Sequence, residues 1–288
     1  MAVGSHALTT LANVKTWLDI SGSSDDALLE AAIDRASAII ATYCDREFVS
    51  STFYEWQMPQ GERNLKVDNI PIQEVHTVAF GHSLALSIES ETASTDILAT
   101  VSFDGTSLRL EKRIADGTRS TATITATDQP STSGLVSFIN ASVSGWTATL
   151  NTNAYTRTLH RFGGRGVLAG PALLHYADDN VAEYEVEFER GIVHIVSDRF
   201  PVEASGYNLN RFPRGFYPVF VEYVAGYSTI PDDLEHVAIE LSADLYRQRL
   251  DDDRMAGEGL GDYNYTRRAT EEILGERMSM LDGFRRIR

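Results

Sequence analysis

The chain has 288 residues, 43% of them hydrophobic, and its 25 Lys and Arg residues against 41 Asp and Glu residues give a formal charge of −16. This length is enough for one large domain or two modest ones. The charge argues against a protein that wraps nucleic acid tightly, because phosphate contacts need clustered basic groups.

The apolar runs and the cysteine content narrow the class of protein further. No run approaches the roughly 18 apolar residues of a membrane helix, and the N-terminus lacks the pattern of a secretory signal. We therefore expect the chain to stay in the cytoplasm of its host cell until it is assembled. A single cysteine, Cys44, excludes an intramolecular disulfide framework. It follows an apolar pair near an expected helix end, so we expect a small buried side chain without a chemical role.

The first forty-odd residues show two helical patterns joined by a Gly-Ser turn. The first follows Thr10 and stops at Gly22, with apolar residues at Leu11, Val14 and Leu18. Ser23 or Ser24 is suited to cap the second helix, and two aspartates at 25–26 favour the positive end of its dipole. Its apolar stripe consists of Leu29, Ile33, Ala36, Ile40 and Tyr43. This helical hairpin needs a third partner to cover its face.

We expect that partner near the other end of the chain. Pro231 lies at or beside a first helical position, and acidic residues at 232–233 occupy the first turn. One face, through to Arg249, carries Leu234, Val237, Ala238, Leu241 and Leu245. The sequence therefore predicts an α+β fold, with a helical core built from both chain ends.

The middle of the chain is expected to be mostly β, with short strands between turn residues. The expected strands are Phe53–Trp56, Leu65–Ile72, Val75–Phe80, Val101–Phe103, Leu108–Leu110, Ala122–Thr127, Trp146–Leu150, Tyr184–Phe188, Ile192–Val196 and Val219–Val224. A helix over Ser133–Ala141 is the exception, because Leu135, Phe138 and Ile139 recur at helical spacing. The strands near 100–127, this helix and the Trp146 strand predict a small α+β subdomain.

The last residues are expected to form an extended docking arm. The acidic run 251–253 is unfavourable at a helix C-terminus, so the chain should leave the helix there. Three glycines free the backbone to follow another surface, and tyrosines are enriched at protein interfaces. A final basic tip follows an amphipathic piece. The candidate docking residues are Gly259, Leu260, Gly261, Asp262, Tyr263, Tyr265, Arg285, Arg286 and Arg288.

Sequence motifs for nucleotide or metal chemistry are weak. The run Gly163-Gly164-Arg165-Gly166 lacks the Lys-Ser or Lys-Thr of a phosphate loop, so a flexible turn is the better interpretation. The seven histidines include no pair at the i, i+4 spacing of a helical metal site. His160, His175 and His194 could still meet in space, although surface or satisfied core histidines are the better interpretation. We expect no catalytic residue, no metal and no cofactor.

Carboxylates are numerous, which leaves a carboxylate enzyme as one alternative. Four glutamates from Glu183 to Glu189 alternate with Tyr184, Val186 and Phe188, a pattern typical of a strand with one wet and one buried face. A loss of hydrolytic activity on mutating Glu185 or Glu187 would support the enzyme, whereas the solvated strand predicts no such activity.

Taken together, these features resemble the head-to-tail connector, or adaptor, proteins of tailed bacteriophages. At the N-terminus the resemblance lies in Leu8 to Leu18, Asp25 to Leu29, Ile33, Ala36, Ile40, Tyr43, Arg46, Asn69 to Ile72 and Val75 to Val78. In the C-terminal half it lies in Gly191 to Val193, Val221 to Tyr227, Pro231, Leu234, Gly259 to Tyr263, Leu281 and the terminal arginines. Each motif is weak alone, but their order and spacing together are fairly specific.

The resemblance implies a structural virion protein and no enzyme. Copies form a ring, usually of twelve, below the portal of the filled head, and the ring carries the next stopper or tail protein. The implied partners are therefore the portal protein, a stopper or tail-completion protein and neighbouring copies. DNA passes through without sequence-specific binding, and no membrane is involved. An acidic channel suits that role, because a wall that repels phosphate lets a duplex slide.

The resemblance also implies a division of the chain into a connector core over 1–96 and 172–250 and a docking arm over 251–288. Residues 97–171 exceed the compact core and look like an inserted β-rich subdomain. A second alternative is a β-rich receptor- or carbohydrate-binding virion protein, which Trp56 and Trp146 would suit. It does not explain the helical ends, and it predicts saccharide binding by residues 97–171.

Overall fold

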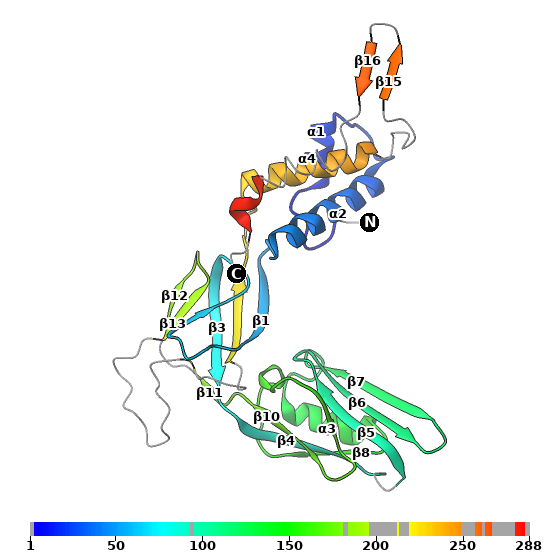
Figure 1. Cartoon of the computed structure of the whole chain (residues 1–288), viewed down its shortest axis with the longest axis vertical. Helices are drawn as coiled ribbons and strands as arrows, with labels where there is room; N and C mark the ends of the chain where they lie inside the picture. The colour runs from blue at the N-terminus through cyan, green and yellow to red at the C-terminus, as the bar shows by residue number, and fades with distance from the viewer. Residues whose placement is uncertain are drawn as a thin grey trace.

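The computed structural model describes residues 3–92, 95–180, 184–195, 212, 219–248, 257–260, 263–266 and 280–285. The fold is α+β, as the sequence predicts. Figure 1 shows an elongated molecule in which a β-hairpin, a group of helices, a first β body and a second β body follow one another along the long axis. The helices α1 (Leu11–Leu18), α2 (Asp26–Cys44) and α4 (Asp232–Gln248) lie together, whereas α3 (Thr132–Ser142) lies in the second β body.

Local capping explains where the N-terminal helices begin. The side chain of Thr10 accepts a hydrogen bond from the Asn13 amide and so caps α1, as its position before the apolar pattern suggests. The expected serine cap of α2 is wrong, because the residue that precedes the helix is Asp25 and it makes no side-chain capping bond. The Asp25 carboxylate instead accepts from the Tyr246 hydroxyl at 2.8 Å, which ties α2 to α4.

The apolar faces of α1 and α2 are covered by α4, from the far end of the chain. One cluster joins Leu8, Ala36, Ile40, Cys44 and Phe48 to Leu234, Val237, Ala238 and Leu241. A second joins Val14, Leu29 and Ile33 to Tyr246. Cys44 is fully buried in the first cluster, as expected, and burial raises the pKa of its thiol to about 11. The three helices therefore hold sequence-distant segments in one apolar core.

The first β body consists of two sheets that share one core. Its larger sheet has the order β1-β14-β3-β11 and its smaller one β12-β13-β2. These strands are β1 (Ser51–Gln57), β2 (Asn64–Lys66), β3 (Ile72–Phe80), β11 (Asp179–Asn180), β12 (Tyr184–Glu187), β13 (Ile192–Ile195) and β14 (Val219–Ala225). Their shared cluster includes Leu65, Val78, Val193, Val221 and Tyr223. The expected continuous strand Leu65–Ile72 is wrong, because a turn ending in the cis Ile70–Pro71 bond separates β2 from β3.

The second β body spans residues 83–176 and has its own core. Its sheets have the orders β10-β4-β8 and β7-β6-β5-β9. The elements are β4 (Ser83–Ser90), β5 (Asp96–Phe103), β6 (Ser107–Ile114), β7 (Arg119–Thr125), β8 (Trp146–Leu150), the 3-10 turn η1 (Thr156–Thr158), β9 (Phe162–Gly166) and β10 (Ala172–Tyr176). Both sheets and α3 bury one face in a single cluster, which includes Leu86, Val101, Leu110, Ile139 and Leu174. This core extends beyond 97–171 at both ends.

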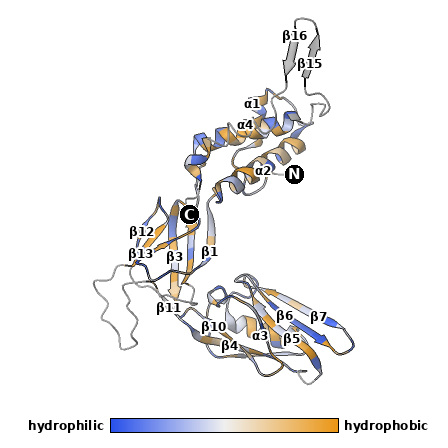
Figure 2. Ribbon diagram, in the orientation of Figure 1, coloured by the Kyte–Doolittle hydropathy of each residue, from blue (hydrophilic) through white to orange (hydrophobic). Residues whose placement is uncertain are grey.

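Hydropathy follows the strands as expected for half-buried sheets. Orange and blue positions alternate along β6 (Figure 2), where Leu108 and Leu110 are buried and Arg109 is exposed. The run Gly163 to Gly166, expected to be a flexible turn, instead lies in strand β9 and pairs with β5. The backbone of this run pairs with β5, so its glycine content is a misleading signal for a turn.

A glycine closes the junction between the first β body and the helices. Gly226 follows β14 with φ +101°, and its amide donates to the Pro71 carbonyl at 2.9 Å. A Cβ at this position would lie 2.7 Å from the Val49 carbonyl oxygen and 2.8 Å from that of Phe48. Only glycine fits, because both the backbone conformation and the neighbouring backbone exclude a side chain.

We expect Gly226→Ala to lower the free energy of unfolding by about 3 kcal/mol or more, since overpacking against rigid backbone adds to the cost of a positive φ. Gly22→Ala is the matched control, because Gly22 also has a positive φ, +97°, but no atom lies within 4 Å of a Cβ built there. It should cost only about 1–2 kcal/mol. Urea unfolding measures both, and equal losses would contradict the packing argument.

Candidate functional site

Arg46 joins three parts of the chain at the end of α2. Its guanidinium donates to the Ile70 carbonyl at 2.6 Å and to the Phe284 carbonyl at 3.4 Å. It also lies 4.7 Å from the centre of the Phe48 ring and 5.8 Å from that of Tyr227. The residue is only 8% exposed, so its charge depends on these carbonyls and rings for solvation. One side chain thus fixes the helices, the turn before β3 and the C-terminal segment.

The C-terminal turn η2 (Asp282–Phe284) packs on this junction. Leu281 is fully buried in the cluster of α2 and α4, and the Phe284 ring meets the Phe48 ring edge-on at 6.2 Å. The Tyr43 hydroxyl donates to the Asp282 carboxylate at 2.7 Å. The expectation that all of 251–288 extends away from the body is therefore corrected for residues 280–285. An apolar Leu281 has more to gain in the helical core than in water.

The predicted docking residues fall into two places. Gly259 and Leu260 lie in β15 (Gly257–Leu260), and Tyr263 and Tyr265 lie in β16 (Tyr263–Thr266). Arg285 lies at the other place, where its guanidinium is 5.0 Å from the centre of the Tyr43 ring and 4.0 Å from the Asp282 carboxylate. In Figure 1 the hairpin lies beyond one end of α4 and the terminal turn beside its other end. Gly261, Asp262, Arg286 and Arg288 lie outside the described residues.

A hairpin replaces the expected extended conformation of the arm around residue 260. The strands β15 and β16 are antiparallel, with Glu258 opposite Tyr265 and Leu260 opposite Tyr263. In the sequence, Gly-Asp separates the two paired segments, and a Gly-Asp step between strand-forming segments is a common hairpin signal. The prediction of an extended arm takes the glycines as backbone freedom and does not use this signal. The hairpin offers paired strands, rather than a free strand, for a contact.

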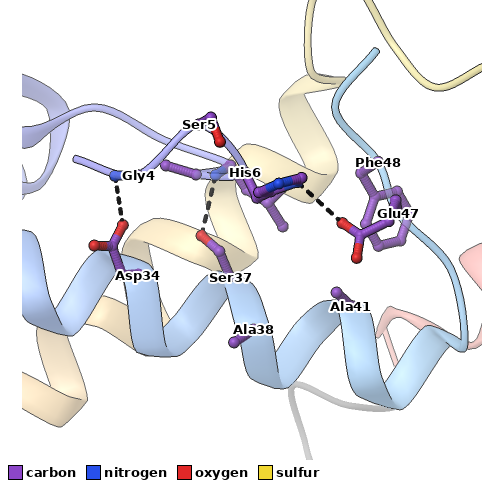
Figure 3. A pocket seen from close by; sticks show the side chains of 11 residues that line it. Gly4, Ser5, His6, Asp34, Ser37, Ala38, Ala41, Glu47 and Phe48 are labelled. Atoms are coloured by element: carbon purple, nitrogen blue, oxygen red, sulfur yellow. Dashed lines mark hydrogen bonds and ion pairs between the residues drawn. The ribbon is translucent and has the colours of Figure 1, made fainter. Parts of the chain in front are cut away.

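A cavity of about 390 Å³ lies between the N-terminal segment and α2 (Figure 3). Backbone amides hold the segment on the helix: that of Gly4 donates to Asp34 at 2.8 Å and that of Leu8 to Ser37 at 3.0 Å. His6 lies 3.4 Å from the Glu47 carboxylate across the opening. The Ser37 hydroxyl also donates to the Ile33 carbonyl at 2.8 Å, so its role is structural. Nothing in residues 4–8 signals this cavity, because it arises from how an irregular segment packs.

The three histidines that lie together differ by one residue from the three that the sequence suggests. His82 stacks on His175 with ring centres 3.9 Å apart, and it lies 5.1 Å from His160. His194 lies elsewhere, where its ring nitrogens contact Glu187 at 2.7 Å and Asn64 at 2.8 Å. Within the residues that the structure describes, no group of three or more His, Cys, Asp or Glu side chains is arranged for a metal ion.

Burial keeps the histidine cluster neutral. Desolvation lowers the pKa of His82, His160 and His175 below the ordinary value of 6.5. Neighbouring charge adds to this effect, because Arg165 disfavours protonation of His82 and His175, and His82 disfavours protonation of His160. Hydrogen bonds and the Asp178 carboxylate oppose it in part. The cluster lies where β3 passes into β4, at the junction of the two β bodies.

The carboxylates on β12 and around β1 make structural contacts. Glu187 binds His194 and lies 3.5 Å from Arg190. Phe188, expected on the buried face of this strand, is 49% exposed because the strand ends at Glu187. Glu55, which the sequence analysis did not single out, accepts from the Tyr223 hydroxyl and from the Asp68 amide. Burial raises its pKa, and its contacts fix the turn between β2 and β3. Glu183 lies outside the described residues.

Of the tryptophans proposed for saccharide stacking, Trp146 is buried and Trp56 is partly buried against other rings. Trp146 is 3% exposed, and its ring lies 5.1 Å from the Lys112 ammonium. Trp56 packs between Phe220, at 5.2 Å, and His160, at 5.1 Å. Neither geometry supports a carbohydrate platform.

Among the described helices, none has the length and apolar character needed to cross a bilayer.

Comparison with known proteins confirms the resemblance seen in the sequence. Residues 8–114 match the family model of the phage gp6-like head-tail connector protein. No curated protein sequence matches the chain. Among solved structures, a chain from the neck of an empty GTA particle, computed with C6 symmetry, is 14% identical with a TM-score of 0.39. A chain from the virion of a native gene transfer agent (GTA) particle is 13% identical with a TM-score of 0.35. Each match covers 100% of this chain and 94% of the other. TM-scores this low do not establish a common fold.

We expect Arg46→Met to lower the free energy of unfolding by about 3 kcal/mol, because two carbonyls lose a charged donor inside the junction. Arg35→Met on the exposed side of α2 is the control and should change it by less than about 0.5 kcal/mol. Guanidinium unfolding measures both variants. Equal effects would show that Arg46 does not hold the junction.

The histidine cluster predicts a loss of stability in acid. Because the folded pKa values lie below 6.5, the unfolded chain binds more protons as the pH falls from neutral through 6.5. The free energy of unfolding should therefore fall over this range, and His160→Gln should make the dependence shallower. Chemical unfolding at a series of pH values tests this, and a slope unaffected by His160→Gln would refute it.

Proposed function

We propose that this chain is a head-tail connector, or adaptor, of a tailed bacteriophage. Twelve copies form a ring below the portal, join the DNA-filled head to the stopper or tail and leave a channel for DNA. The observation that carries the proposal is the family match over residues 8–114, which contains both N-terminal helices. The virion is then the site of action, with assembly in the host cytoplasm, and the role is structural rather than catalytic.

We assign the three packed helices and the first β body to the connector core, and the second β body to an insertion. The chain leaves the core at Phe80 and returns at Asp179, and these two residues pair across β3 and β11. Because the chain leaves and re-enters the core at adjacent positions, a separately packed unit can be inserted there without changing the pairing of the core strands. The separate hydrophobic clusters of the two β bodies support the same division.

The distribution of charge supports a repulsive channel in the core. Residues 83–176 contain seven acidic and seven basic residues, so the formal charge of −16 belongs to the rest of the chain. A ring of twelve copies would carry −192, twelve times the charge of one chain. Acidic walls around a duplex would repel its phosphates and let it slide. A lumen lined by lysines in the assembled ring would overturn this assignment.

We place the portal contact at the β15–β16 hairpin and the basic C-terminal residues. The hairpin lies beyond the helical end of the molecule, with strand edges available for pairing (Figure 1). The stopper or tail-completion protein and the neighbouring copies then use surfaces other than the hairpin and the basic C-terminal residues.

The two parts of the C-terminal region should separate in deletion experiments. Replacing residues 257–266 by a Gly-Ser linker should leave the melting temperature unchanged and abolish attachment to the portal in a pull-down assay. Truncation after residue 279 is the contrasting variant, because it removes the buried Leu281 and the contact of Phe284 with Phe48. It should lower stability by about 2–5 kcal/mol. A linker variant that still joins heads to tails would contradict the docking role of the hairpin.

A further inference from the structure

The outer face of the sheet β7-β6-β5-β9 is rich in arginine. Along β6, Leu108 and Leu110 point into the core, while Arg109, Glu111 and Arg113 alternate with them and point outward. Arg119 on β7 and Arg161 beside β9 are exposed on the same sheet. We call Arg109, Arg113, Arg119 and Arg161 the arginine face. It stands out in a chain whose formal charge is −16.

The charges of the arginine face are incompletely balanced within the chain. Arg113 lies directly opposite Arg119 in the register of β6 and β7, an arrangement of like charges that is unfavourable without a counter-charge. Glu111 lies 2.7 Å from Arg119 and 3.2 Å from Arg109, but the described part of the chain supplies no ion pair to Arg113. Beside them, a hollow of about 620 Å³ is lined by Arg109, Arg161, Asp104 and Phe162, and Asp104 supplies some negative charge near Arg161. This face therefore suits a partner surface that carries carboxylates and is uneven enough to fill the hollow.

The other sheet of the second β body presents the complementary chemistry. Leu173 on β10 pairs with Ser87 on β4, and Ser87 pairs with Thr149 on β8, so the three side chains lie on one face of the sheet. Leu173 is 42% exposed there. Glu89 follows on the same face of β4, and exposed Glu91 accepts from the Thr147 hydroxyl at 2.6 Å. We call Glu89, Glu91, Thr149 and Leu173 the glutamate face. Because both sheets bury their inner faces in one cluster, these two outer faces point away from each other.

We propose that the arginine face of one copy binds the glutamate face of the next. A closed ring needs such a head-to-tail contact between two different surfaces, so this inference rests on the proposed connector function. Carboxylates from the neighbour supply the missing counter-charge beside Arg113, and Leu173 adds an apolar contact to a polar rim. Duplex DNA fits the arginine face less well, because tracking a row of evenly spaced phosphates needs an unbroken run of basic groups, which Glu111 interrupts between Arg109 and Arg119, whereas single carboxylates need positive charge only beside Arg113. The insertion thereby gives the ring an outer layer of contacts.

A mixing experiment tests the proposal with full-length protein. Arg113→Glu with Arg119→Glu removes one face, and Glu89→Lys with Glu91→Lys removes the other. Each double variant should self-associate at least about tenfold more weakly than the wild type in sedimentation equilibrium at low salt. An equimolar mixture of the two should associate again in alternating order, because the retained faces bind each other and the two reversed faces are complementary as well. The chain with all four substitutions should regain association.

The control carries the same charge change elsewhere, at exposed Arg35 and Arg190, and should associate like the wild type. Unchanged melting temperatures show that the substituted chains fold. The proposal is overturned if the double variants match the wild type, if the control weakens association equally or if the wild type remains monomeric at every concentration. It is also overturned if the arginine face instead retains a duplex DNA probe that Arg113→Glu with Arg119→Glu releases.

Cysteine pairing tests the direction of the contact. Oxidation of a chain with Thr121→Cys, on the arginine face, and Thr149→Cys, on the glutamate face, should give a ladder of crosslinked species, whereas either substitution alone should give none. Dimers from Thr121→Cys alone would indicate a symmetric contact and overturn the proposal. Rings that form at the portal despite the reversed charges would refute this contact but leave the connector function standing. Absence of any ring at the portal would refute the connector function itself.

Discussion

The buried guanidinium of Arg46 is the contact on which the arrangement of the molecule depends. A charge taken out of water must be solvated by the protein, and here the Ile70 and Phe284 carbonyls and the Phe48 and Tyr227 rings perform that task. These groups come from the turn before β3, the C-terminal segment and the start of the sheet. Because these groups must solvate the guanidinium charge, the helices are held against the first β body. Gly226 allows the backbones at this junction to approach each other closely.

This junction divides the molecule into parts with different tasks. The helical unit carries the proposed portal hairpin beyond one end of α4 and holds the C-terminal turn at the other (Figure 1). The first β body links the helices to the second, whose total charge is balanced and whose two outer faces differ, one rich in arginine and the other carrying Glu89 and Glu91. The proposed connector core with an insertion would account for both features, because the acidic part would surround the proposed channel and the insertion would supply contacts between neighbours.

The sequence predicted those elements whose signals are local or strongly periodic. Thr10 marks the start of α1, the apolar positions of α4 lie in the helical core, and the apolar residues around Leu135 mark α3. Strand β4 is not among the predicted strands, although Leu86 and Ile88 alternate with Ser87 and Glu89, and β9 is not recognised because of its glycines. Contacts between distant residues had no comparable signal. Neither the burial of Leu281 nor the stacking of His82 on His175 follows from spacing, because both depend on how separately formed units pack. The candidate docking residues were identified as one arm, whereas the fold separates the hairpin from Arg285.

Electron cryo-microscopy of the full-length chain mixed with the portal protein of the same phage tests the central claim most directly. The account predicts a twelve-membered ring on the portal, with the β15–β16 hairpin against the portal and residues 83–176 on the outside, away from the DNA channel. A chain that stays unbound, or a ring with residues 83–176 lining the channel, would contradict it.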